Sequence, residues 1–198
     1  HHVTMGSRSA TSTAAQEWLA QVHGQAAELA SIGTFAEAAS NSELTFNATA
    51  GVASLAALQT VGVDGLAGKV LIDVANPLDF SHGFPPELSV CNTVSLAEQI
   101  QSAFPRTPVV KALNTVTAGV MVHPDIVPGD HVLFIAGNDQ DAKTTVTSML
   151  GEFGWPAERI KDLGDISAAR GTEMYLPLWL RLMGSLGTAN FNVSINVE

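Results

Sequence analysis

The sequence predicts an α/β protein with a Rossmann-like, doubly wound, mostly parallel sheet and a small C-terminal helical extension. Strand-like segments alternate with segments of helical spacing along almost the whole chain, which is typical of a parallel sheet with helices on both faces. The segment 69–75 (KVLIDVA) is a nearly continuous apolar run, as expected for a strand buried on both faces. With 46% hydrophobic and 14% charged residues, the 198-residue chain has a globular composition.

The first half of the chain opens with a strand that ends at Met5 and a turn over 6–9. Apolar residues at three- and four-residue spacings predict a helix over 10–30, with threonine and serine N-caps at its start. The remaining elements predicted before residue 80 are a helical turn over 34–39, a strand over 44–49, a helix over 52–58 and the strand over 69–75.

In the second half, two helices begin with N-terminal capping residues. Ser95 and Glu98 form the pattern of a capping box at the start of a helix over 95–103, and Asp139 begins a helix over 139–153. The other elements predicted there are a loop over 80–93, strands over 108–113, 132–136 and 159–163, a final helix over 167–186 that Pro177 kinks, and an edge strand over 191–197.

The charge pattern excludes several kinds of partner. Nine Lys and Arg oppose nineteen Asp and Glu, and no basic stripe is present, so neither nucleic acid nor an anionic membrane is expected as a partner. The most apolar run, 174–183, is too short to span a bilayer and contains Arg181. Cys91 is the only cysteine, so an intramolecular disulfide is impossible and a cytoplasmic location is expected.

The candidate site lies after the predicted strands, because ligands of such sheets bind beyond the carboxyl ends of the strands. In a dinucleotide-binding fold, an acidic residue after the second strand binds the ribose of NAD, whereas an arginine there accommodates the 2′-phosphate of NADP. This chain has Ser7-Arg8 and no carboxylate nearby. Arg8 could fork onto phosphate oxygens, and the hydroxyls of Ser7 and Ser9 could donate to the same group. The alternative is an arginine in a solvated turn.

Two further side chains are candidates for a substrate pocket. Lys111 either directs its ammonium at a phosphate or carboxylate of a ligand, or pairs with Asp73 or another strand carboxylate. His82 lies in the loop after Pro77 and is the histidine best placed to meet a substrate. The histidine spacings fit no metal-binding motif, so no metal site is predicted.

Five segments in order resemble a known family. They are VTMGSRS, VLIDVANPLD, VVKALNTV, FIAGNDQDA and DLGDISAARGTEM, and together they cover nearly the whole chain. The chain resembles the F-420-dependent NADP oxidoreductases, which exchange hydride between NADP and the deazaflavin coenzyme F-420. It is also similar to the cytoplasmic reductase domain of the membrane ferric reductases.

The resemblance implies a Rossmann domain that binds NADP over residues 1–137 and a C-terminal portion over 138–198 that completes the site. In the family, the Ser-Arg after the second strand holds the 2′-phosphate. The residues that the resemblance places along the cofactor are Ser7 and Arg8 at the 2′-phosphate, Ala48 and Thr49 at the diphosphate and nicotinamide ribose, and Asn76, Pro77, Asn114 and Thr115 at the nicotinamide. Ala75 is expected beside them, because its small side chain leaves room for a flat second ring system.

The expected function is hydride transfer between NADP(H) and a small-molecule acceptor, either coenzyme F-420 or a related flavin. No catalytic side chain is expected, because the cofactor carries the reactivity and the protein positions it. The alternative is a sensor or scaffold protein that binds NADP without turnover. An open pocket over the nicotinamide is needed by an enzyme and not by a sensor.

Two expectations concern the ends of the chain. Large apolar residues on the last helix, including Leu178 and Trp179, and the following segment 191–197 favour a homodimer formed through this part. No G-x-G-x-x-G motif is present, although residues 2–5 resemble a second strand. We therefore expect the natural protein to begin about 20–30 residues earlier, with a strand, a glycine-rich turn and a helix.

Overall fold

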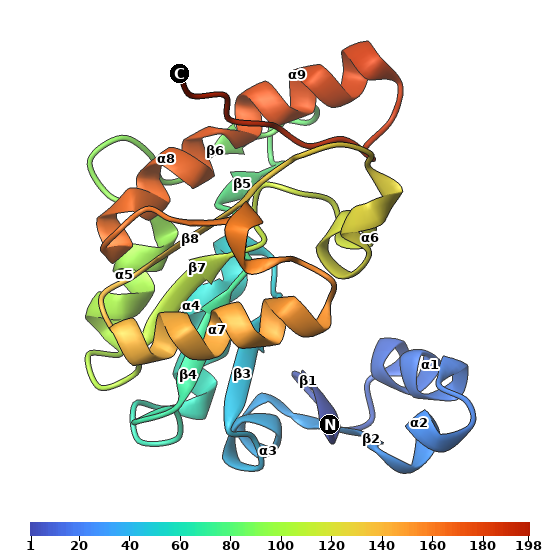
Figure 1. Cartoon of the computed structure of the whole chain (residues 1–198). Helices are drawn as coiled ribbons and strands as arrows, with labels where there is room; N and C mark the ends of the chain where they lie inside the picture. Colours follow the sequence, from blue (N-terminus) through green and yellow to red (C-terminus); the bar gives the residue numbers. More distant parts are fainter.

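The computed structural model describes residues 1–198 as three sheets surrounded by helices (Figure 1). The largest sheet has five strands in the order β3-β4-β7-β8-β9. All its neighbours are parallel except β7 and β8, which are antiparallel, so the predicted mostly parallel sheet is confirmed. Its strands are β3 (Leu44–Asn47), β4 (Val70–Asp73), β7 (Val109–Ala112), β8 (Leu133–Gly137) and β9 (Ile160–Asp162).

Helices cover both faces of this sheet, because alternate strand residues point to opposite sides. Leu71 of β4 packs into a core formed with helices α4, α5 and α8, whereas the next residue, Ile72, packs into a second core with α6 and α7. The helices that cover the two faces are α4 (Gly51–Val61), α5 (Leu96–Ala103), α6 (Ala118–Val122), α7 (Gln140–Glu152) and α8 (Ala169–Met174).

The N-terminal part forms a separate two-stranded sheet (Figure 1). Its parallel strands are β1 (Val3–Ser7) and β2 (Ala30–Thr34), and β1 does not pair with β3. The single helix predicted over 10–30 is wrong. Gly24, at φ +65°, interrupts it, and the chain then enters β2. The helices of this part are α1 (Thr13–Gln21), α2 (Gln25–Glu28) and α3 (Phe35–Ser40).

The capping residues predicted for the helices that begin after Ser95 and Asp139 are confirmed, whereas Ser12, the N-cap residue of α1, makes no side-chain capping hydrogen bond. Ser95 accepts from the Glu98 backbone N–H while the Glu98 side chain accepts from the Ser95 backbone, which completes the capping box of α5. Asp139 caps α7 by accepting from the Ala142 N–H. Polar residues at these positions accept hydrogen bonds from N–H groups that have no partner within the helix. Because such residues are preferred at helix starts, the sequence predicted where these two helices begin.

The C-terminal part differs from the prediction in two ways. The last helix divides at Tyr175 into α8 and α9 (Leu176–Leu186), with Pro177 in the first turn of α9, where its missing N–H is not needed. The strand predicted over 191–197 is wrong. This segment has no strand structure and runs back beside α9 (Figure 1). It makes a single backbone hydrogen bond, from Val132 N to Val193 O at 3.0 Å.

Short elements complete the chain. The segment predicted as a loop over 80–93 contains a short strand, Glu87–Leu88, which pairs with Leu78–Asp79 as an antiparallel hairpin, so only 80–86 connects the two strands. The division expected at residue 137 falls inside the five-stranded sheet, because β9 pairs with β8 across it. No helix combines the length and the apolar character needed to cross a membrane. The remaining elements are β5 (Leu78–Asp79), β6 (Glu87–Leu88) and the 3-10 turns Pro124–Ile126, Ala157–Arg159 and Ile166–Ala168.

Candidate functional site

A pocket of about 380 Å³ opens at the carboxyl ends of β3 and β4, beside the first turn of α4. This is the edge of the sheet at which α/β proteins bind ligands. Four of the residues predicted for the cofactor lie in its wall, and the hairpin β5–β6 adds an apolar side. The residues from these two sources are Ala48, Thr49, Ala75, Asn76, Leu78 and Phe80.

The first turn of α4 forms one wall of the pocket. Ala50 is the N-cap residue, and no side chain caps the helix. The first N–H groups of a helix have no partners within it, and its dipole favours negative charge at this end. A Cβ at Gly51 would lie 1.9 Å from the carbonyl oxygen of Asn76. Only glycine at this position therefore lets the chain that follows β4 pass so close to the first turn of α4.

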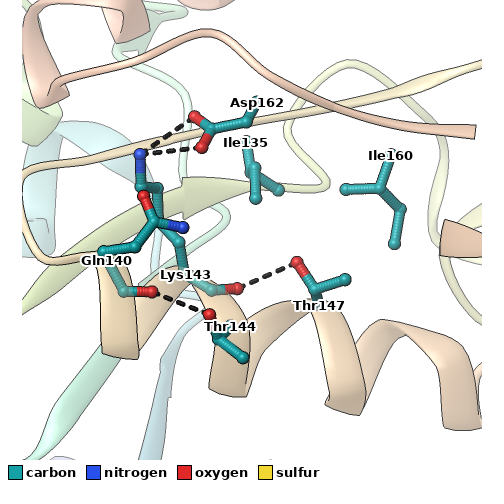
Figure 2. A pocket seen from close by; sticks show the side chains of 7 residues that line it. All are labelled: Ile135, Gln140, Lys143, Thr144, Thr147, Ile160 and Asp162. Atoms are coloured by element: carbon teal, nitrogen blue, oxygen red, sulfur yellow. Dashed lines mark hydrogen bonds and ion pairs between the residues drawn. The ribbon is translucent and has the colours of Figure 1, made fainter. Parts of the chain in front are cut away.

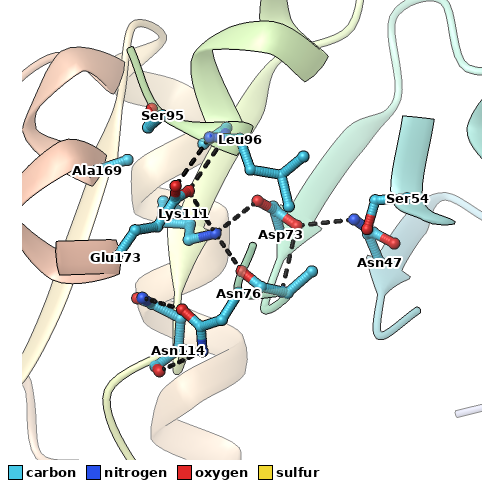
Figure 3. Close-up of polar contacts among 12 residues, drawn as sticks. Asn47, Ser54, Asp73, Asn76, Ser95, Leu96, Lys111, Asn114, Ala169 and Glu173 are labelled. Carbon is cyan, nitrogen blue, oxygen red and sulfur yellow. Dashed lines mark hydrogen bonds and ion pairs between the residues drawn. The ribbon is translucent and has the colours of Figure 1, made fainter. Parts of the chain in front are cut away.

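Asn76, which lines the pocket, pairs with Asn114, which is buried and is not one of the lining residues (Figure 3). The two asparagines follow neighbouring strands, as predicted. Asn76 Nδ2 donates to the Asn114 carbonyl oxygen at 2.8 Å, and Asn114 Nδ2 donates to Asn76 Oδ1 at 2.9 Å. Leu113 precedes Asn114 in the left-handed region, at φ +64°, where a residue with a side chain costs about 1–3 kcal/mol. The strained turn directs Asn114 toward Asn76.

The two predicted threonines differ in how their hydroxyls are used. Thr49 Oγ1 donates to Asn47 Oδ1 at 2.7 Å and contacts Ser54 Oγ at 2.9 Å, so it is engaged inside the protein. The Thr115 hydroxyl is buried and has no hydrogen-bond partner. Pro77 lies against Gly51, and its carbonyl oxygen accepts from Ser89.

The predicted phosphate-binding residues lie apart from this pocket, at the end of β1. Ser7 Oγ donates to the Ser9 carbonyl oxygen at 2.5 Å, and Ser9 Oγ contacts Thr11 Oγ1 at 2.9 Å, which forms a tight turn. Arg8 projects from this turn, is exposed, and takes part in none of the ion pairs of the structure. Its guanidinium is therefore available to an anion.

The two substrate-pocket candidates are not in the pocket wall. Lys111 is 1% exposed and pairs with Asp73, which is one of the two alternatives that its position in the sequence left open. Burial and this pairing remove its ammonium from any ligand. His82 is exposed in the hairpin connection, and its Nδ1 lies 3.6 Å from Glu87 Oε2.

Glu173 is the residue whose importance sequence reasoning missed. Arg170 and Glu173 are one helical turn apart but do not pair with each other. Arg170 pairs across helices, with its Nε donating to Glu98 at 2.8 Å, whereas Glu173 contacts the Lys111 ammonium at 2.9 Å. The hydrogen bond from Arg170, against the opposing effect of burial, holds the pKa of Glu98 below its usual value.

A second, smaller hollow of about 230 Å³ lies between α7 and β9 (Figure 2). The ammonium group of Lys143, which lines this hollow, is bound to Asp162 Oδ2 at 2.8 Å. Thr144 and Thr147 donate to backbone carbonyls of their own helix, so their hydroxyls are also engaged. The hollow offers a ligand no free charge. No cluster of three or more His, Cys, Asp or Glu side chains is arranged to hold a metal ion.

Solved structures show what this fold and site are similar to. A crystal structure from Arthrobacter sp. FB24, provisionally described as an F-420-dependent NADP reductase, is 47% identical, with a TM-score of 0.91 over 100% of this chain and 89% of that one. A reductive aminase from Aspergillus terreus, at 21% identity, TM-score 0.53 and coverage of 93% and 62%, shares the fold alone.

A curated relative agrees over part of the chain. The metalloreductase STEAP3 of Rattus norvegicus is 33% identical over 121 residues, which are 59% of this chain and 22% of that protein. The match thus spans about a fifth of the length of STEAP3. No protein-family model matches the chain.

The sheet is mostly parallel, and its pocket lies beyond the strand ends. Together with these relatives, this defines the class of the protein, which is an NADP-dependent oxidoreductase with a Rossmann-like fold. Within that class, the chain belongs to the F-420-dependent NADP reductase family, because all of this chain matches 89% of the Arthrobacter protein at 47% identity.

Proposed function

We propose that the protein binds NADPH and transfers hydride from it to the deazaflavin coenzyme F-420. When bound, NADPH supplies the hydride, so the protein need only bind, orient and shield the reacting rings. The observation that carries the proposal is the coincidence of four predicted cofactor residues in one pocket at the carboxyl ends of β3 and β4.

Arg8 is suited to the 2′-phosphate that distinguishes NADP from NAD. It is exposed, has no carboxylate partner, and follows a parallel strand. A guanidinium binds phosphate oxygens through two parallel N–H bonds, which makes it selective for such a group. The hydroxyls of Ser7 and Ser9 lie in the same turn and add donors once they exchange their present partners.

The pocket wall is suited to the nicotinamide end. The uncapped first turn of α4 offers backbone N–H groups to ribose or diphosphate oxygens. Asn114 Oδ1 accepts no hydrogen bond within the protein, and each amide group of the Asn76–Asn114 pair retains one N–H. These atoms can hold the carboxamide of the nicotinamide and thereby fix the face that the ring presents.

The acceptor is assigned from the relatives and from one wall of the pocket. The Arthrobacter protein is described as F-420-dependent, whereas STEAP3 is named as a metalloreductase. Phe80 lines the pocket and is 57% exposed, so its ring is available to stack on a flat second ring system. This wall favours a planar deazaflavin over a ferric chelate.

Steady-state oxidation of NADPH tests the proposal. NADPH absorbance is followed with the full chain and each of three acceptors, namely F-420, FMN and a ferric chelate. Turnover with F-420 and much slower turnover with the others is expected. Oxidation with the ferric chelate alone would reassign the acceptor. Tight NADPH binding without oxidation in any mixture would indicate the sensor or scaffold function instead.

We further propose that the enzyme is a homodimer that buries the outer face of α9. Only Leu176 of this helix is buried, and Leu178 and Leu186 are more than half exposed. Trp179 stacks on Phe191, with ring centroids 5.3 Å apart, and so packs the tail against the helix. An exposed apolar row of this kind is typical of a surface that a second subunit covers.

A further inference from the structure

Three polar residues form a buried row across neighbouring strands. Asn47 of β3 is the register partner of Asp73 in β4, and Asp73 is the register partner of Lys111 in β7. Asn47 Nδ2 donates to Asp73 Oδ1 at 2.8 Å, and Lys111 Nζ donates to Asp73 Oδ2 at 2.8 Å (Figure 3). None of the three is more than 2% exposed, so the row is an internal feature of the sheet.

The Lys111 ammonium is fully used inside the protein. Besides Asp73, it contacts Glu173 Oε1 at 2.9 Å and donates to the carbonyl oxygen of Ala75. An ammonium group has three donors, and each has a partner here. The role of Lys111 must therefore be exerted through these partners, because no donor remains for a ligand.

Glu173 connects the same ammonium to two helices. It belongs to α8, and its carboxylate accepts from the backbone N–H groups of Leu96 at 2.8 Å and Ala97 at 3.1 Å, in the first turn of α5. A carboxylate is stabilised at a helix N-terminus by these donors and by the helix dipole. Lys111 and Glu173 thus join the sheet, α5 and α8 at one buried point.

Ala75 is the point at which this cluster meets the pocket. β4 ends at Asp73, so strand pairing no longer fixes Ala75. Its backbone is held from both sides by the cluster, since its N–H donates to Asp73 Oδ1 at 3.3 Å and its carbonyl oxygen accepts from Lys111. Ala75 and the following Asn76 line the pocket, and Asn76 pairs with Asn114.

We propose that Lys111 is a positioning residue for the hydride-transfer site, an inference that rests on the proposed function. It holds the Ala75 carbonyl and thereby fixes the position of Asn76 at the nicotinamide. An apolar side chain of similar size could fill the volume, but it would leave that carbonyl without a donor and two buried carboxylates without a cation. A cation at this position secures one backbone geometry at the pocket wall.

The effect on the reaction follows from the geometry that hydride transfer requires. Reacting carbons must come within about 3–3.5 Å, and a misplacement of about 1 Å can slow a reaction on the order of a hundredfold. Loss of the Lys111 contact is therefore expected to lower kcat about a hundredfold. The KM for NADPH should change less than about threefold, because the phosphate contact at Arg8 is remote from the pocket wall.

The test uses a charge-balanced pair of substitutions and a matched control. Lys111→Met with Asp73→Asn removes one cation and one anion, so no new net charge is buried, and Glu173 keeps its α5 donors. The control, Lys143→Met with Asp162→Asn, removes a second 2.8 Å lysine–aspartate pair, on α7 and β9. Both proteins are first checked for native circular dichroism.

Two readouts separate positioning from stability. Hydrogen exchange over residues 74–78 should accelerate about tenfold or more in the Lys111 variant and remain unchanged in the control. The kcat for NADPH oxidation should fall in the Lys111 variant alone. Unchanged exchange over 74–78, or equal losses of kcat in both proteins, would overturn the inference.

The outcomes also separate this inference from the proposed function. The Lys111 variant could show faster exchange over 74–78 while the wild-type protein fails to oxidise NADPH with any acceptor. This outcome would support the role of Lys111 in positioning the segment and would reject the proposed reaction. If the double variant does not fold, Asp73→Asn alone is measured. It keeps the cation and loses part of the ion pair, so a smaller acceleration over 74–78 is expected, and no acceleration would overturn the inference.

Discussion

The carbonyl oxygen of Asn76 occupies the space that a side chain on Gly51 would require, since a Cβ there would lie 1.9 Å away. The exit of β4 therefore rests directly on the first turn of α4. This contact brings the side chain of Asn76 and the N–H groups of the helix to one pocket. The close approach of two backbones is what assembles the candidate nicotinamide site.

Gly51→Ala should accordingly displace the Asn76 segment. Overpacking at a site with no space costs about 1–3 kcal/mol, so the variant should unfold at a lower temperature and bind NADPH more weakly. The matched control is Gly151→Ala in α7, where an added Cβ has no neighbour within 4 Å and should stabilise by up to about 1 kcal/mol. Equal melting temperatures for the two variants would contradict this view of the contact.

Arg8→Ala should reduce the affinity for NADPH and leave that for NADH nearly unchanged. A charge-assisted hydrogen bond contributes about 1.5–3 kcal/mol, which corresponds to roughly a ten- to hundredfold increase in Kd. Titration calorimetry with both cofactors measures the difference. Arg106→Ala, which removes a surface arginine paired with Asp64, is the control and should alter neither affinity. Equal losses of NADPH and NADH affinity would show that Arg8 does not select the phosphate.

The Glu98–Arg170 pair should make stability depend on acid pH. The hydrogen bond from Arg170 lowers the pKa of Glu98 below its usual 4.5 in the folded protein. Such a group stabilises the fold above its unfolded pKa and loses this contribution as the pH falls through the lowered value. Arg170→Met should thus lower the melting temperature at pH 7, and its difference from wild type should shrink as the pH falls below 4.5.

The control for this pH dependence is Arg159→Met. The Arg159 partner, Asp130, has a side chain that is 97% exposed, and pairs of this kind contribute little to stability. Arg159→Met should therefore change the melting temperature little at any pH. A difference between Arg170→Met and wild type that persists undiminished in acid would show that the ion pair is not its cause.

Leu178→Glu should convert the proposed dimer to a monomer. Leu178 is 56% exposed in the structure, so a charge there does not disturb the subunit core but would be buried without a partner in the interface. Sedimentation velocity at micromolar concentration measures the change, with far-ultraviolet circular dichroism as the check on folding. A wild-type protein that sediments as a monomer would refute the dimer.

The sheet of the main body was predictable from the sequence because its strands are nearly continuous apolar runs. The strands over 69–75 and 108–113 and the capped helices after Ser95 and Asp139 depend on local composition, which the sequence displays. By contrast, β2 was missed because Ala30–Thr34 contains glycine and small polar residues and follows a helical spacing. Its structure comes from pairing with β1, which is a tertiary contact.

The site was predictable only where it follows strand ends. Asn76 and Asn114 come directly after predicted strands, and the structure brings them together. The contact of Lys111 with Glu173 joins residues 62 positions apart through the packing of α8, which no spacing in the sequence displays. The pairing of Lys111 with Asp73 was one of the two alternatives left open by the sequence, and the parallel register of β4 and β7 makes these two residues direct neighbours.

Transfer of isotope from cofactor to acceptor tests the central claim most directly. NADPH that carries deuterium at both hydrogen positions of its reactive nicotinamide carbon is mixed with the full chain and oxidised F-420, and the reduced deazaflavin is examined by mass spectrometry. We predict that the deuterium appears on the deazaflavin ring, because direct hydride transfer passes the hydrogen without exchange with water. Reduced deazaflavin that carries no deuterium, or no reduction at all, would contradict the account.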